Sequence, residues 1–157
     1  CEASMYRMVF AATLFVVVTP VSYSRAQDSD FAFFSQLDDA IGTVSPDTAR
    51  QSHAICLEIG NKIAARSGMS PLMRLYFESQ VERCIALAMN NGSYSDDSGD
   101  QCSHQFAHAS KLAQLIKEAG SHEVNASLLP EYRDRLESAV RDGEEMKCAQ
   151  DFASFKG

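Results

Sequence analysis

The sequence has few basic residues: 14 lysines and arginines stand against 21 aspartates and glutamates in 157 residues, which gives a formal net charge of -7. A nucleic-acid-binding surface needs a surplus of lysine and arginine, because much of its affinity comes from neutralising phosphates. The composition therefore argues against a nucleic acid as the partner. With 45% hydrophobic and 22% charged residues, the chain otherwise has the composition of one globular domain.

The motifs that mark common active sites are also absent. No two cysteines are spaced C-x-x-C, which argues against a thioredoxin-like redox site, a four-thiolate zinc site and a covalently attached haem. The G-x-S-x-G nucleophile elbow, the P-loop and the dinucleotide-binding fingerprint are not found either. We therefore predict that the protein is not an enzyme and has no cofactor.

No apolar run is long enough to span a bilayer, which takes about 20 residues. The run at residues 8–18 is 11 residues long and follows the positive charge of Arg7. Beyond it, Ser24 and Ala26 place small residues three positions and one position before a cleavage site. This order of charge, apolar run and small residues is typical of a secretory signal peptide that is cleaved after Ala26. The alternative is a short membrane anchor that is not cleaved.

Cleavage at this position would divide the chain into two parts. Residues 1–26 would comprise an upstream extension, residues 1–4, and the signal peptide. Residues 27–157 would form a single helical domain in the periplasm or outside the cell, without stable insertion in a membrane. A domain of this length buries about two-thirds of the surface of its unfolded chain, which is enough for a hydrophobic core.

Proline, glycine and capping residues predict a chain of helices. Ser45-Pro46 and Ser70-Pro71 each combine an N-cap residue with a proline at the first helical position, and Asp100 is a third N-cap. Asn-Asn-Gly at 90–92 and Gly120 are typical of helix ends. The predicted helical segments are 31–41, 46 to about 68, 71–92, 101–120 and about 128–152.

Apolar residues recur at three- and four-residue spacing in these segments, as they do on the core-facing side of a helix. Alternating strand-like runs joined by hairpin dipeptides are absent, and short connections favour antiparallel neighbours. Four cysteines behind an export signal predict two disulfides: Cys56, Cys84, Cys102 and Cys148. The sequence therefore predicts an all-α fold, an up-and-down bundle of four main helices plus a short N-terminal helix, held by two disulfides.

Helix geometry favours one pairing of these cysteines. With a rise of 1.5 Å per residue, Cys84 lies about 10 Å and Cys102 about 4 Å from the bundle end that holds the loop at 92–99. On the same scale, Cys148 lies about 8 Å and Cys56 about 15 Å from that end. Matched levels favour a disulfide between Cys56 and Cys84, and the second would then join the other two cysteines. Pairing of Cys84 with Cys102 stays open, and pairing of Cys56 with Cys102 is least favoured.

The last helix needs a change of direction to place its cysteine. On a straight helix, Cys148 would point roughly 160° away from Tyr132 on the apolar face. Glycine lowers helix stability by about 1 kcal/mol relative to alanine and permits a break or kink. We therefore expect a bend near Gly143.

Two histidines, His104 and His108, lie four residues apart in the predicted helix 101–120. This spacing brings two imidazoles to one metal ion, but a complete site needs a third ligand. His122 and His53 are the candidates for that ligand. The competing interpretation is that His104 and His108 pack between helices or face solvent.

Three phenylalanines, Phe31, Phe33 and Phe34, stand close together in the first predicted helix. They are candidates for a partner-binding face, and the competing interpretation is that they cover the end of the bundle. Two functions follow from the sequence. The first is an exported binding or interaction module with a protein as its partner. The alternative is a carrier of a metal or small ligand that uses His104 and His108.

Overall fold

The computed structural model describes residues 21–97, 99–121 and 127–156, with side chains from residue 32 onward. Within these residues the fold is all-α, as predicted, with five α-helices, a short 3-10 helix and no β-strand. The α-helices are α1 (Val21–Gly42), α2 (Ala49–Ala65), α3 (Pro71–Gly92), α4 (Gln101–Gly120) and α5 (Leu129–Glu145), and the 3-10 helix is η2 (Phe152–Phe155).

The predicted capping residues begin α3 and α4. Ser70 Oγ accepts a hydrogen bond from the backbone N–H of Met73 at 3.2 Å. Asp100 Oδ1 accepts one from the backbone N–H of Ser103 at 2.8 Å. These bonds satisfy backbone donors that the first turn of a helix leaves unpaired. Both helices therefore begin where the sequence indicated.

α2 begins three residues later than predicted, at Ala49 rather than Pro46. The reason is a turn in which Ser45 and Thr48 bond to each other. Thr48 Oγ1 accepts a hydrogen bond from the backbone N–H of Ser45 at 2.9 Å. Ser45 therefore stabilises the turn before the helix rather than capping the helix itself.

α1 ends at Gly42 as predicted but begins earlier than residue 31, at Val21. Residues 21–30 contain no proline or glycine that would end a helix there. The predicted cleavage site after Ala26 consequently lies within α1. Residues 1–20, which carry most of the predicted signal peptide, lie outside the described part of the chain.

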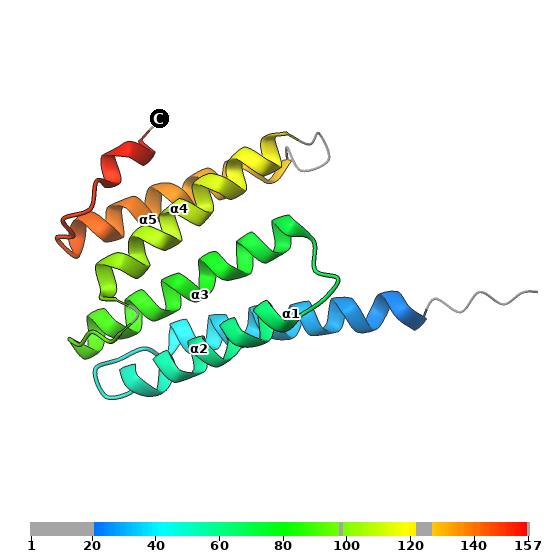
Figure 1. The fold of residues 1–157 in the computed structure, drawn as a ribbon, viewed down its shortest axis with the longest axis horizontal. Coiled ribbons are helices and arrows are strands. Elements are labelled where there is room, and N and C mark those ends of the chain that lie inside the picture. Colours follow the sequence, from blue (N-terminus) through cyan, green and yellow to red (C-terminus); the bar gives the residue numbers. More distant parts are fainter. Residues whose placement is uncertain (1–20, 98, 122–126, 157) are drawn as a thin grey trace, which may run out of the picture.

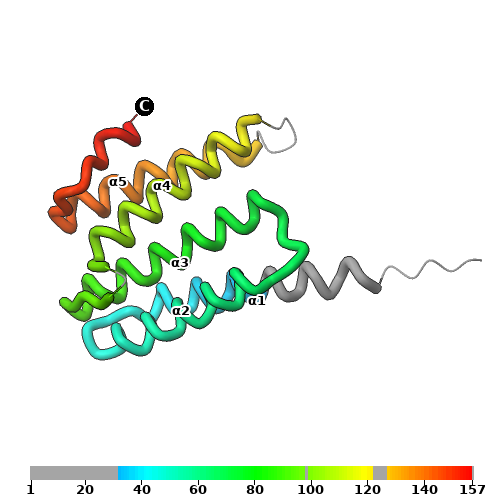
Figure 2. Tube along the Cα trace, in the orientation of Figure 1, coloured from blue at the N-terminus to red at the C-terminus, as the bar shows by residue number. Residues whose placement is uncertain are grey.

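α3 lies at the centre of the molecule (Figure 1). α1 and α2 pack against one side of α3, and α4 packs against the other, with α5 beyond α4. The helices from α2 to α5 run up and down in chain order, which is also seen in the Cα trace (Figure 2). The bundle is open, because the backbones of α2 and α5 do not approach each other anywhere in the described chain.

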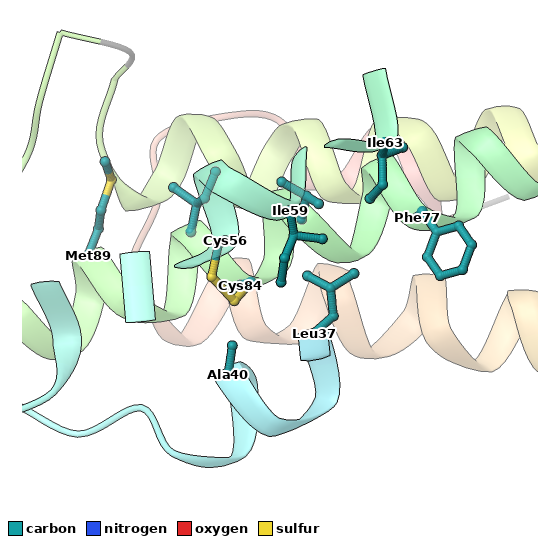
Figure 3. Close-up of a cluster of buried hydrophobic side chains, with 10 residues drawn as sticks. Leu37, Ala40, Cys56, Ile59, Ile63, Phe77, Cys84 and Met89 are labelled. Carbon is teal, nitrogen blue, oxygen red and sulfur yellow. A yellow bond between two sulfur atoms is a disulfide. The ribbon is translucent and has the colours of Figure 1, made fainter. Parts of the chain in front are cut away.

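The open arrangement produces two hydrophobic cores that meet at α3. The first core lies between α1, α2 and α3 (Figure 3) and consists of Leu37, Ala40, Cys56, Ile59, Ile63, Phe77, Val81, Cys84, Ile85 and Met89. The second consists of Ala109, Leu112, Leu115, Ala139, Val140 and Phe152. Leu72, Leu75 and Tyr76 of α3 pack against this second core. α3 therefore contributes side chains to both cores.

The two disulfides have the preferred pairing, which is thereby confirmed. Cys56 of α2 is bonded to Cys84 of α3, with their Cα atoms 6.0 Å apart. Cys102, at the start of α4, is bonded to Cys148, which follows α5, with their Cα atoms 5.3 Å apart. Both separations suit a disulfide, for which about 4.4–6.8 Å is usual.

The chain reaches Cys148 because α5 ends. α5 continues through Gly143 to Glu145, so the expected change of direction comes at the helix terminus rather than at the glycine. Lys147 then adopts a left-handed backbone conformation with φ of 58°. The backbone N–H of Cys148 donates to the Gly143 carbonyl at 3.1 Å, which closes this turn.

Gly143 has another role: it lets the Phe152 ring lie directly on α5. A Cβ at this position would lie 2.5 Å from the nearest ring carbon, and the ring is buried between Phe106 and Phe155. We expect Gly143→Ala to lower the free energy of unfolding by about 1 kcal/mol or more, because overpacking exceeds the gain in helix propensity.

Urea denaturation measures this effect, and Gly42→Ala is the matched control. A Cβ at Gly42 would meet nothing within 4 Å, so this substitution should leave stability unchanged or raise it slightly. Equal stability of the two variants would contradict the role given to Gly143.

Candidate binding site

A cleft of about 290 Å³ lies where α3, α4 and α5 meet. α3 contributes Gln80 and Arg83, and α4 contributes His108. The wall on α5 consists of Glu131, Asp134, Arg135, Ser138, Ala139 and Asp142. The cleft exists because α5 packs on α4 and not directly on the backbone of α3. Its volume is at the lower end of the range for small-molecule sites, about 300–1,000 Å³.

His108 lines this cleft and is only 3% exposed. Its Nδ1 has no hydrogen-bond partner within the described part of the chain. In a neutral imidazole Nδ1 is an acceptor when the proton lies on Nε2, and no described residue donates to this atom. Burial, and after it the charge of Arg83, lowers the pKa of His108 to about 3, so the ring is neutral.

Arg83 and Asp142 are two charged groups of the cleft that have no direct partner. In the residues that the structure describes, neither side chain makes a hydrogen bond or an ion pair. Burial raises the pKa of Asp142, and the charge of Arg83 opposes this change. The guanidinium and the carboxylate thus influence each other through the cleft without touching.

Arg135, by contrast, is already held in place. Its Nε and Nη2 donate to Glu131 Oε1 at 3.0 Å and 2.8 Å. Its guanidinium carbon also lies 5.6 Å from the centre of the Tyr76 ring, which is a cation–π distance. Because these contacts occupy Arg135, the guanidinium of Arg83 is the better placed of the two to bind an anion.

A smaller hollow of about 80 Å³ adjoins the cleft, and Gln80, Arg83 and Arg135 line both. The rest of its lining comes from α1 and α3 and is mostly apolar: Phe34, Leu37, Asp38, Ile41, Tyr76 and Phe77. The cleft and this hollow together offer a polar end around His108 and an apolar end around Phe34.

The predicted phenylalanine cluster has members in different surroundings. The Phe33 ring packs edge-on against Phe77, with 6.1 Å between ring centres, and thus joins the first core. Phe34 is 42% exposed and lines the small hollow. The side chain of Phe31 lies outside the described residues. Of the cluster, Phe34 is therefore the residue that adjoins the candidate site.

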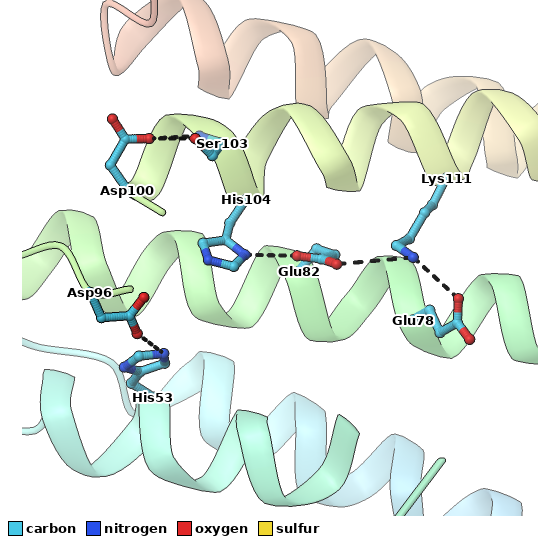
Figure 4. A network of polar contacts seen from close by, with 8 residues as sticks. All are labelled: His53, Glu78, Glu82, Asp96, Asp100, Ser103, His104 and Lys111. Carbon is cyan, nitrogen blue, oxygen red and sulfur yellow. Dashed lines mark hydrogen bonds and ion pairs between the residues drawn. The ribbon is translucent and has the colours of Figure 1, made fainter. Parts of the chain in front are cut away.

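The two predicted metal ligands also have separate environments, although both are buried on α4. His104 Nδ1 lies 2.8 Å from Glu82 Oε2 (Figure 4). Lys111 Nζ lies 3.2 Å from Glu78 Oε2 and 3.9 Å from Glu82 Oε1. These contacts join α3 to α4, so the ring of His104 belongs to a polar network between two helices and His108 to the cleft.

The candidates for a third metal ligand do not join them. His53 Nε2 lies 3.4 Å from Asp96 Oδ2, beside α2 (Figure 4), and burial lowers the pKa of its ring. His122 lies outside the described residues. Within the described ranges, no three His, Cys, Asp or Glu side chains are placed to hold a metal ion together. Metal binding by His104 and His108 stays a prediction that no contact here supports.

Comparisons with models of known protein families, with characterised proteins and with solved structures return no match to this chain. The interpretation of the cleft therefore depends on its own residues. Sequence reasoning singled out His108 and Phe34 for other roles, and it missed Arg83 and Asp142. Asp142 belongs to α5, which is rich in charged residues, and Arg83 is one of four charged residues in α3. No spacing in the sequence distinguishes either of them from a solvated charge.

Proposed function

We propose that this protein is an exported binding protein and that it holds a small organic ligand in the cleft between α3, α4 and α5. The observation that carries the proposal is the unpartnered Nδ1 of His108, which is buried and lines the cleft. A buried polar atom without a hydrogen bond costs about 1–3 kcal/mol. A ligand that donates a hydrogen bond to Nδ1 would offset this cost.

Export is part of the proposal. Its support is the arrangement of charge, apolar run and small residues at the N-terminus, together with two disulfides, which are compatible with an oxidising compartment. Among the helices that the structure describes, none is both long and apolar enough to cross a membrane.

Native mass spectrometry of protein recovered from the exported fraction of its source organism tests both parts. The mature chain should begin at Gln27 or within a few residues of it, and a fraction of the molecules should carry one small-molecule adduct. Ser138→Phe should abolish the adduct, because Ser138 lines the cleft and the added ring would fill it.

Glu137→Phe is the matched control, since it adds the same ring to an exposed neighbouring position of α5 that does not line the cleft. This variant should keep the adduct. Ligand binding is refuted if no adduct is found on the parent protein, or if the two variants lose it equally while remaining helical by circular dichroism. Recovery of the full chain from the cytoplasm would refute export.

A further inference from the structure

Three groups that line the cleft have hydrogen-bonding atoms that no described residue uses. One group is a donor and two are acceptors. Arg83 offers only hydrogen-bond donors and a positive charge. The Asp142 carboxylate offers only acceptors, and the neutral ring of His108 can present Nδ1 as a further acceptor. A simple anion would satisfy Arg83 but would face the carboxylate and the imidazole lone pair. A simple cation would satisfy those two but would face the guanidinium.

The geometry points to a free α-amino acid as the ligand, which rests on the function proposed above. We infer that its carboxylate binds Arg83 and that its ammonium group donates to Asp142 and to Nδ1 of His108. An α-amino acid carries these two groups on one carbon atom, so both fit within the cleft of about 290 Å³ that the three residues share. Charge-assisted hydrogen bonds of this kind are about twice as strong as neutral ones.

The other acidic groups that line the cleft do not alter the pairing of one positive with one negative group. Glu131 is bonded to Arg135, so that pair is neutral as a whole. Asp134 is exposed at the rim, where water solvates it. Among the charges of the cleft, Arg83 and Asp142 thus remain as one positive and one negative group, which matches a zwitterion.

The side chain of the amino acid is assigned to the adjoining hollow. Gln80, Arg83 and Arg135 line both spaces, so a ligand held at Arg83 lies next to the apolar lining at Phe34, Leu37 and Ile41. Burial of an aliphatic or aromatic side chain there would remove apolar surface from water. The ligand class is therefore an α-amino acid with an apolar side chain, such as leucine or phenylalanine.

Isothermal titration of the ligand-free mature protein with L-leucine tests this inference, with L-phenylalanine measured beside it. Two analogues each remove one charge from leucine: L-leucinamide lacks the carboxylate, and 4-methylpentanoate lacks the ammonium group. We expect one site for at least one of the two amino acids, and at least tenfold weaker binding of the corresponding amide and deaminated acid.

Two variants test which residue binds each charged group of the amino acid. Arg83→Met should weaken binding of the amino acid at least tenfold but should not weaken binding of its amide. Asp142→Asn should weaken binding of the amino acid but not of the deaminated acid. Arg133→Met and Asp151→Asn are the controls, because these exposed residues make the same charge changes outside the cleft. Both controls should bind like the parent.

The outcomes separate this inference from the proposed function. Absence of amino-acid binding at millimolar concentration would overturn the inference, and so would equal affinity for the amino acid and both analogues. If the exported protein nevertheless carries an adduct that Ser138→Phe abolishes, the cleft is a binding site for another class of ligand. If that adduct is also absent, the proposed function fails as well.

Discussion

Replacement of both Cys102 and Cys148 by alanine should lower the free energy of unfolding by about 4 kcal/mol. The disulfide closes a loop across a sequence separation of 46 residues, and the chain-entropy model gives about 4 kcal/mol for a loop of that length. The bond also holds the segment that carries Phe152 against the second core. Urea denaturation followed by circular dichroism measures the loss.

The Cys56–Cys84 disulfide provides the comparison, because it closes a loop with a separation of 28 residues in the other core. Its replacement by two alanines should cost a similar amount, about 3.6 kcal/mol. Only the loss of Cys102–Cys148 should make residues 149–156 rapidly accessible to protease. A loss below about 1 kcal/mol, with the C-terminal segment still protected, would show that this bond does not hold the segment in place.

The second large effect is a loss of stability in mild acid. The pKa of His108 falls from an ordinary value of 6.5 to about 3 on folding, mainly through burial. The unfolded chain therefore takes up a proton that the folded protein does not, so the contribution of His108 is complete above pH 6.5 and is lost progressively toward pH 3. The free energy of unfolding should fall by about 2 kcal/mol between pH 7 and pH 5 from this residue alone.

The measurement is the free energy of unfolding as a function of pH, compared between the ligand-free parent protein and His108→Gln. Glutamine is polar, as histidine is, but does not titrate. His53, whose pKa is also lowered, and Asp142, whose pKa is raised, titrate in both proteins and cancel in the comparison. Identical slopes between pH 7 and pH 5 would show that His108 is accessible to protons in the folded state.

The fold could be predicted from the sequence because its signals are local. Ser70 and Asp100 cap helices through bonds that reach three residues along the chain, and Gly42 ends a helix at its own position. The disulfide pairing followed from the rise per residue along antiparallel helices. The start of α2 was predicted three residues too early. The sequence around Ser45 and Thr48 is compatible both with a helix cap at Ser45 and with the turn that the two residues form.

The candidate site could not be predicted in the same way, because it depends on how far apart two helices lie. An up-and-down order is compatible with a closed bundle or an open one, and only the open one leaves a cleft beside α3. Arg83 of α3 and Asp142 of α5 line that cleft from different helices. His108 lies on a buried face of α4, but the sequence does not indicate that its Nδ1 lacks a partner.

The position of α3 between the two cores has a consequence for how the molecule unfolds. Loss of the α4–α5 side would expose Leu72 and Leu75, and loss of the α1–α2 side would expose Phe77, in each case on the same helix. Opening of either half therefore removes support from the other, so we expect unfolding to be cooperative although the bundle is not closed. The backbone amides of α3 would exchange with solvent only through global unfolding. A ligand bound beside Arg83 would in turn stabilise both halves through the helix that they share.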